Sequence, residues 1–219
     1  MVALYQLTRV LVWTLLIVGL VIGLLRTIAI RWVRLPRDDI VFTTSTLPTL
    51  GPGDLILTYR LGAPVFGDLV LCPEPGYPER FIIGRIIGEA GDEVQIKDGR
   101  PIVNDRPFAT ERNCDPLTFT YPHPDRDEET VTQQCSWEAT TNGQVHMLGE
   151  IGIFKVVPED RKYQIAEGQL FLISDNRVFP YDSRDYGTVD RSSCREIVFG
   201  RLVSGEGWSV VEKRLNYIQ

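Results

Sequence analysis

Ser45 is the residue of this 219-residue chain whose surroundings most suggest covalent chemistry. It lies in the segment Thr43-Thr44-Ser45-Thr46-Leu47-Pro48-Thr49-Leu50, directly before Gly51-Pro52-Gly53. A serine hydroxyl becomes an effective nucleophile when a neighbouring base takes its proton. Serine is also common in Gly- and Pro-rich turns for a local reason, because its hydroxyl bonds the nearby backbone. Ser45 is therefore a candidate nucleophile only if the rest of the chain supports that role.

A second polar segment lies far downstream, at residues 174–187, and reads Ser-Asp-Asn-Arg-Val-Phe-Pro-Tyr-Asp-Ser-Arg-Asp-Tyr-Gly. Together with the Ser45 segment, and behind an apolar N-terminal helix, it resembles the type I signal peptidases. These are membrane-anchored serine proteases that remove leader peptides from exported proteins. Their first motif is Ser-Met-x-Pro-Thr-Leu, which is Ser45 to Leu50 here. By this resemblance Ser45 is the nucleophile, and Thr43 donates to the oxyanion beside the Ser45 backbone N–H.

In this family the general base is a lysine, and the matching position of this chain holds Gly84. The motif that carries the lysine is Lys-Arg-Val-Ile-Gly-x-Pro-Gly-Asp, and Gly88-Glu-Ala-Gly91-Asp92 fixes its register. Moving the register by one residue, to use Arg85, breaks the Gly-Asp match and points the side chain to the other face of the strand. Arginine is also a poor base, because its guanidinium stays protonated.

The last motif of the family is Gly-Asp-Asn-Arg-x-x-Ser-x-Asp-Ser-Arg, and two triplets of this chain match it with the correct spacing. Pro180 stands where the family has the serine that orients the lysine. The resemblance implies a structural role for the triplets, with an internal ion pair between Asp182 and Arg184. They are Asp175-Asn176-Arg177 and Asp182-Ser183-Arg184.

Two functions remain open on these residues. A retained Ser45 favours a working signal peptidase whose base comes from elsewhere in the chain. The paired loss of the lysine and its serine partner favours a non-catalytic relative that binds leader peptides or a partner peptidase, such as an active paralogue. The candidate substitute bases lie outside the motifs, and they are Lys97, Lys155, Lys162, Lys213, His123 and His146.

The apolar run Val10–Leu25 predicts a membrane anchor. It has 16 residues without a charge, which cover roughly 24 Å as a helix, and continuing it through Ile30 supplies the length of a bilayer core. We expect a tail over residues 1–9 and an anchor over residues 10–30. The alternative is a cleaved secretory signal. No small-x-small cleavage site follows the run, and Trp32 with the nearby arginines suits a membrane interface.

Charge and cysteines bear on the location of the larger domain. Residues 1–37 hold five arginines and no acid, and arginines after the helix favour a cytoplasmic domain. The four cysteines suit an oxidising compartment, and the family exports its catalytic domain, so we expect the exported, periplasmic side. All 29 acidic residues lie beyond residue 37, which disfavours binding to nucleic acid. The absence of a Cys-x-x-Cys pair argues against zinc, and the family implies no cofactor.

Beyond Pro36 the pattern is that of a mainly β protein, with short apolar runs between Gly- and Pro-containing turns and no sustained helical periodicity. We expect an antiparallel signal-peptidase-like β domain over residues 38–219, with an inserted β lobe at 104–150. Asp98-Gly99 predicts a hairpin turn between residues 94–97 and 101–103. Further strands are expected at residues 54–58, 68–71, 81–87, 144–148, 151–157, 169–173 and 197–203. Four cysteines allow three pairings, and pairing Cys114 with Cys135 would close the lobe and leave Cys72 with Cys194.

Overall fold

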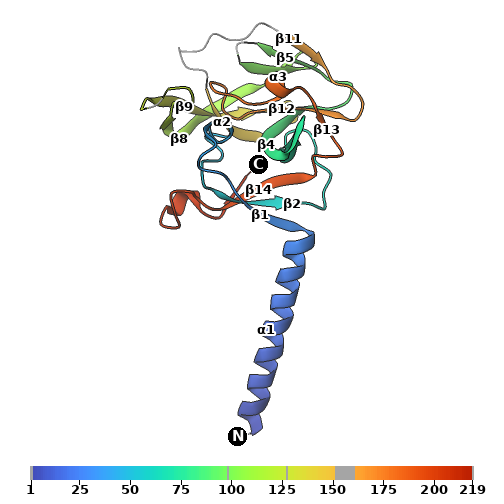
Figure 1. The fold of residues 1–219 in the computed structure, drawn as a ribbon, viewed down its shortest axis with the longest axis vertical. Coiled ribbons are helices and arrows are strands. Elements are labelled where there is room, and N and C mark those ends of the chain that lie inside the picture. The colour runs from blue at the N-terminus through green and yellow to red at the C-terminus, as the bar shows by residue number, and fades with distance from the viewer. Residues whose placement is uncertain (1, 98, 127, 151–160, 219) are drawn as a thin grey trace.

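One long helix leads into a β-rich domain (Figure 1). The structure is a computed structural model that describes residues 2–97, 99–126, 128–150 and 161–218. Helix α1, Val2–Ile28, includes a 23-residue apolar segment, Gln6–Ile28, that is long enough to cross a membrane and is not covered by the domain. The helix begins at Val2, in the stretch for which the sequence suggested a separate tail, and ends two residues before Ile30.

The largest sheet has the strand order β1-β2-β14-β3-β4-β12-β13, with β15 paired to β14, and its neighbouring strands are antiparallel. The predicted mainly β, antiparallel fold is thus confirmed. The strands are β1 (Ile30–Arg34), β2 (Leu55–Tyr59), β3 (Leu69–Glu74), β4 (Tyr77–Gly88), β12 (Gln169–Ile173), β13 (Val189–Asp190), β14 (Glu196–Val203) and β15 (Asn216–Tyr217).

Strand β1 follows α1 almost directly and pairs with β2 along its whole length, from Ile30 opposite Tyr59 to Arg34 opposite Leu55. Its arginines contact the domain: Arg31 donates to Glu196 at 2.9 Å, and Arg34 donates to the Gly53 carbonyl at 3.0 Å. The sequence had suggested that the β region starts after Pro36. The sheet begins earlier because these basic residues have partners in the fold.

Two smaller sheets complete the domain. One has the order β10-β9-β8, formed by β8 (Ala109–Pro122), β9 (Thr130–Ala139) and β10 (Val145–Gly149). The other has the order β11-β5-β6-β7, formed by β5 (Glu93–Lys97), β6 (Arg100–Val103), β7 (Arg106–Pro107) and β11 (Arg161–Gln164). The predicted hairpin is present as β5 and β6, and the predicted strand at 144–148 corresponds to β10. The strand predicted at 151–157 lies outside the described residues.

Strand β4 divides the core, because its successive side chains point to opposite faces of the sheet. Ile82 and Ile86 pack with Leu172 and with the disulfide-bonded Cys72 and Cys194. Ile83 and Ile87 point to the opposite face, where each joins a separate apolar cluster. A second disulfide links Cys114 to Cys135, so the structure has both predicted pairs.

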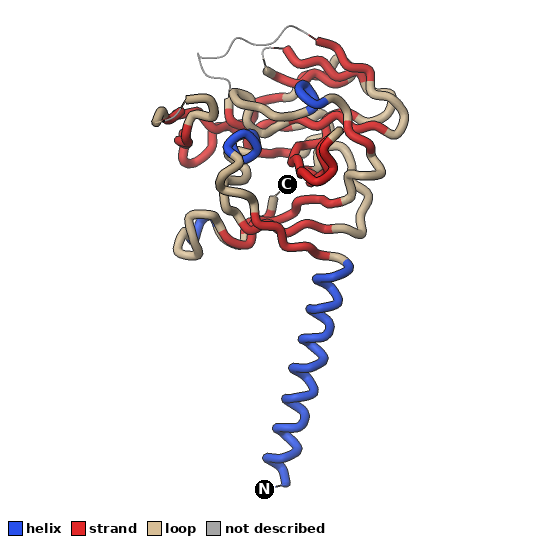
Figure 2. The backbone as a smooth tube through the Cα atoms, viewed as in Figure 1, coloured by secondary structure: helices blue, strands red, loops and turns tan. Residues whose placement is uncertain are grey.

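Short helices follow Pro36 as well (Figure 2), although the sequence predicted none. They are α2 (Ile40–Ser45), α3 (Ser183–Tyr186) and the 3-10 turn Val211–Lys213. Helix α2 is capped by Asp39, whose side chain accepts from the Phe42 N–H at 3.0 Å. Six residues are too few to show a helical repeat in the sequence, which is why this helix was missed.

Candidate functional site

Ser45 is the last residue of α2, rather than part of the turn that the sequence suggested. Its side-chain hydroxyl donates to the Phe42 carbonyl at 2.7 Å, and the residue is only 1% exposed. The chain leaves the helix here because Leu47 precedes Pro48, and a residue before proline avoids the helical conformation. In this structure the Ser45 hydroxyl therefore bonds its own helix.

Thr43, the predicted oxyanion donor, is also buried in α2. Its hydroxyl donates to the Asp39 carbonyl at 2.8 Å, one turn earlier in the chain. Ser45 and Thr43 thus belong to one helical turn. The role of Thr43 toward an oxyanion stays a prediction.

Asn176 connects the serine segment to the downstream motif. Its backbone N–H donates to the Ser45 carbonyl at 3.0 Å, and its side-chain amide donates to the Thr44 carbonyl at 3.0 Å. The side-chain oxygen in turn accepts from the Val178 N–H at 2.9 Å. Two segments that are 130 residues apart are therefore joined by main-chain contacts at the C-terminal end of α2.

Gly84 lies on the apolar face of β4. A β-carbon at this position would lie 2.9 Å from Leu172 Cβ and 3.5 Å from the Ile173 carbonyl oxygen. The first separation is shorter than carbon atoms tolerate, and the obstructing atom is next to the Leu172 backbone. A side chain at position 84 therefore requires a shift of β4 or β12.

The structure describes three of the four lysines, and two of them form ion pairs with residues outside α2. Lys97 ends β5 opposite Arg100, Lys162 pairs with Glu93 at 2.5 Å, and Lys213 pairs with Glu206. Lys155 lies outside the described residues. None of the three described lysines has an ion pair or hydrogen bond to α2.

Arg85, the neighbour of Gly84, points to the opposite face and is fully buried. Its Nε and Nη2 donate to the two carboxylate oxygens of Asp175 at 3.1 and 3.0 Å, and its Nη1 donates to the Gly67 carbonyl at 2.8 Å. The Thr49 hydroxyl also donates to Asp175, at 2.6 Å. Burial would raise the pKa of Asp175, but Arg85 and His146 outweigh it and hold this pKa below its usual value.

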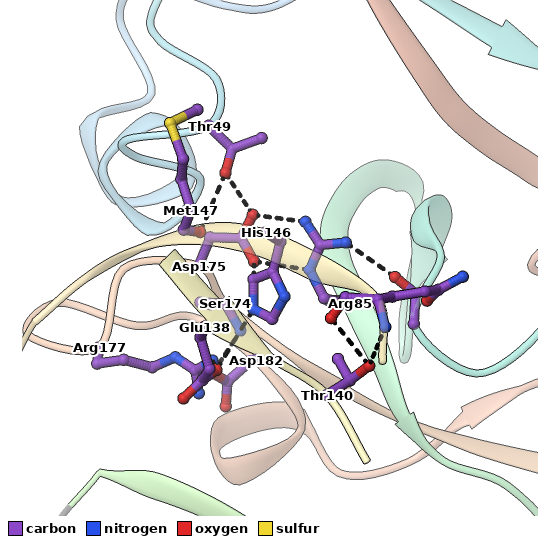
Figure 3. A network of polar contacts seen from close by, with 12 residues as sticks. Thr49, Arg85, Glu138, Thr140, His146, Met147, Ser174, Asp175, Arg177 and Asp182 are labelled. Carbon is purple, nitrogen blue, oxygen red and sulfur yellow. Dashed lines mark hydrogen bonds and ion pairs between the residues drawn. The ribbon is translucent and has the colours of Figure 1, made fainter. Parts of the chain in front are cut away.

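A second buried ion pair lies on the other side of His146 (Figure 3). Arg177 donates to Glu138 Oε2 at 2.6 Å, and His146 Nε2 lies 3.4 Å from the same oxygen and 3.9 Å from Asp175 Oδ1. Burial would raise the pKa of Glu138, but Arg177 and His146 lower it. Burial and the charge of Arg85 lower the pKa of His146.

The Asp182-Ser183-Arg184 triplet forms the start of α3. The predicted ion pair is present, with Arg184 Nη2 at 2.7 Å from Asp182 Oδ2. Asp182 also accepts from the Ser174 N–H at 2.9 Å, and Ser183 Oγ accepts from the Leu172 N–H at 2.9 Å. The triplet thus fixes the end of β12, including the leucine that covers Gly84.

Next to α2 lies a cavity of about 210 Å³. Its lining combines apolar side chains, such as Leu35, Phe42, Leu71 and Phe81, with the charged residues Arg34, Asp39, Glu79 and Arg80. Strand β12 pairs with β4 only from Arg85 onward. In the described chain, the β12-side edge of residues 77–84 is therefore unpaired. No group of three or more His, Cys, Asp or Glu side chains in the described ranges could hold a metal ion.

From the sequence, His146 is a candidate only as a substitute base, and Glu138 is not singled out. Asn142-Gly143 predicts a turn in this region. A hairpin with a three-residue loop at 141–143 places residue 138 opposite residue 146, which is their register in the structure. Assigning β9 before that turn would have identified the pair.

Comparison with known proteins agrees with the resemblance. The family described as "Signal peptidase, peptidase S26" matches residues 7–202. The signal peptidase I of Aquifex aeolicus (strain VF5) is 26% identical over 200 residues, which cover 80% of this chain and 78% of that protein. The signal peptidase I of Rickettsia prowazekii (strain Madrid E) is 28% identical over 127 residues, 55% of this chain and 45% of that protein.

Among solved structures, the chain is similar to the crystal structure of a signal peptidase I from Enterococcus faecalis V583. The TM-score is 0.39 and the sequence identity 19%, over 62% of this chain and 97% of that chain.

Proposed function

The chain belongs to the signal peptidase family, peptidase S26, and on this premise we propose that it binds leader peptides of exported proteins without cleaving them at an appreciable rate. The observation that carries this proposal is Gly84. By the register of the motif it matches the family's lysine, and the space where a side chain would begin is filled by Leu172.

Without a base, Ser45 is a weak nucleophile at neutral pH. Its hydroxyl already bonds the Phe42 carbonyl, and Pro180 provides no hydroxyl to orient a base. In a serine protease, loss of a residue that acts together with the nucleophile lowers the rate by several powers of ten. These features together support binding without turnover.

Two features support peptide binding. The unpaired edge of β4 at residues 77–84 offers backbone groups to which an extended segment could add as a further strand. The cavity beside α2 offers a site for small or apolar side chains of that segment. The unpaired edge belongs to β4, which contains Gly84, and the cavity borders α2, which contains Ser45.

The proposed site lies in a domain that follows α1 directly, and the relatives and the apolar helix support a membrane-anchored protein. We propose that the domain is on the exported side, which is also consistent with two disulfides. A C-terminal alkaline phosphatase fusion should then be active, and a reporter that works only in the cytosol should be silent. The reverse pattern would reject the exported location.

The proposal is tested with the full chain in detergent or nanodiscs and a fluorescent leader peptide in which Ala-x-Ala is followed by several further residues, so that the peptide contains the bond that the family cleaves. We expect saturable binding, with the peptide still intact after prolonged incubation. A peptide with aspartate in place of both alanines should bind much more weakly. An equally long peptide that is N-methylated at alternate residues should also bind weakly, because it cannot pair as a strand.

Ser45→Ala is the matched variant. It should bind the peptide as the wild type does, since it removes only the hydroxyl. Robust cleavage by the wild type that is lost in Ser45→Ala would overturn the proposal and reveal a working base. His146→Ala and Lys97→Ala would then identify that base.

A further inference from the structure

Three consecutive residues after β12 each contact a different part of the fold. Asp175 pairs with Arg85 of β4, Asn176 holds the end of α2, and Arg177 pairs with Glu138 of β9. All of these side chains are buried. We call residues 175–177 the linking segment, because it joins the main sheet, the serine helix and the β8–β10 sheet.

His146 of β10 lies between the two ion pairs that the ends of the linking segment form with Arg85 and Glu138 (Figure 3). Its side chain is 1% exposed, and its Nε2 lies 3.4 Å from Glu138 Oε2 and 3.9 Å from Asp175 Oδ1. Neither ring nitrogen has a well-formed hydrogen bond among the described residues. A buried imidazole without such bonds is costly to retain for packing alone.

The backbone also connects β10 to the linking segment. The Gly149 N–H donates to the Asp175 carbonyl at 2.9 Å, and the Arg177 N–H donates to the Gly149 carbonyl at 3.1 Å. Asn176, which bonds the carbonyls of Thr44 and Ser45, lies between these two contacts. Asn176 thus connects the strand that carries His146 to the serine helix.

We propose that His146 is a positioning residue of the leader-peptide site, and that protonation of its imidazole displaces the linking segment and weakens peptide binding in acid. This inference rests on the proposed function, since it assigns a control to that same site. The neutral imidazole is the state that fits between the two ion pairs.

The charges around the imidazole determine the direction of the effect. Arg85 acts on it from β4, Asp175 faces it from the linking segment and Glu138 from β9, and Arg177 pairs with Glu138 on the far side of that carboxylate. Two guanidinium groups and two carboxylates already balance, so protonation adds an unmatched charge to a buried site. Burial and Arg85 accordingly lower the pKa of His146.

Titration of the Asp175 and Glu138 carboxylates does not offset the response of the His146 imidazole to pH. The pKa values of Asp175 and Glu138 are both below their usual range, so both groups stay charged while the imidazole titrates. Two further groups near the cluster have pKa values that burial raises. They are Asp68, which follows the Gly67 whose carbonyl accepts from Arg85, and Tyr121, whose hydroxyl accepts from the Asn176 side chain.

The experiment measures the affinity of the full chain for a leader peptide without ionisable side chains, from pH 8 to pH 5. We expect wild-type affinity to fall by about tenfold for each pKa unit by which His146 differs between the bound and free states. His146→Gln, which keeps a polar group near the Nε2 position but takes up no proton in this range, should have an affinity that changes little between pH 8 and pH 5.

His123→Gln is the matched control, because the chain has only two histidines and His123 lies outside this cluster. It should retain the full pH response, and so should Asp68→Asn. A wild-type affinity that is constant from pH 8 to pH 5, or an unchanged response in His146→Gln, would overturn the inference. Absence of binding at pH 8 would instead overturn the proposed function.

A second measurement covers the case in which His146→Gln does not fold. Hydrogen exchange of the wild type should show the protection factor of the Asn176 amide falling on acidification, while the amides of the β5–β6 hairpin keep theirs. Equal changes at both places would mean general loosening of the domain, and would overturn the inference.

Discussion

Gly84 and Arg85 are adjacent in β4 but lie in opposite environments. On the apolar face, Leu172 covers Gly84 and leaves no space for a side chain. On the opposite face, between Ile83 and Ile87, Arg85 makes a two-point contact with Asp175 and a third contact with the Gly67 carbonyl. One face of the strand thus has no side chain at residue 84, where the motif register predicts the family's base, while the other keeps an extensive set of buried contacts.

This difference separates two functions of one strand. The contacts of Arg85 fix the linking segment, and through Asn176 they fix the serine helix. They require only that charges and hydrogen bonds be satisfied, so they persist whether or not peptide bonds are cleaved. A lysine at residue 84 matters only for cleavage. Loss of the base is therefore compatible with an intact binding site.

The largest expected effect comes from removing the arginine. Arg85→Met leaves the Asp175 carboxylate buried without its guanidinium, and should lower the free energy of unfolding by about 3–5 kcal/mol. Adding Asp175→Asn should recover part of that loss, because the unmatched charge is then gone. Denaturant unfolding followed by tryptophan fluorescence measures both changes.

Lys162→Met is the control for this prediction. Lys162 also forms an ion pair, with Glu93 at 2.5 Å, but its side chain is 55% exposed. Exposed pairs contribute little, so we expect no measurable change in unfolding. Equal losses in Arg85→Met and Lys162→Met would contradict the assignment of stability to the buried face.

The smaller effect concerns the apolar face. Gly84→Ala adds one carbon 2.9 Å from Leu172 Cβ, and overpacking of this kind should cost about 1–3 kcal/mol. The same unfolding experiment measures it. Gly84→Lys should cost at least as much, because it carries the same first carbon.

Gly51→Ala provides the comparison, since the atoms nearest to its added carbon are 3.9–4.0 Å away. It should be neutral or slightly stabilising, because alanine restricts the unfolded chain. If Gly84→Ala proved as stable as Gly51→Ala, the strands would have room at residue 84. Replacing Gly84 with lysine would then become a realistic way to introduce a base.

Local patterns predicted much of the fold. Asp98-Gly99 marked the hairpin between β5 and β6, and alternating apolar residues marked β2, β4 and β12. The bounds of α1 and β1 were less certain, because an apolar run does not reveal where a helix gives way to a strand. Ile30 is equally suited to a helix and to a strand, and its pairing with Tyr59 places it in β1.

The sequence by itself determined the family, the order of its motifs and the glycine at residue 84, because these depend only on residue types and spacing. It also suggested that Arg85 and Gly84 point to opposite faces, since strand side chains alternate. Only the tertiary structure decided that Leu172 fills the space where a side chain of residue 84 would begin and that His146 lies between two ion pairs. These contacts join strands far apart in the chain, and such neighbours follow from packing rather than from any local pattern.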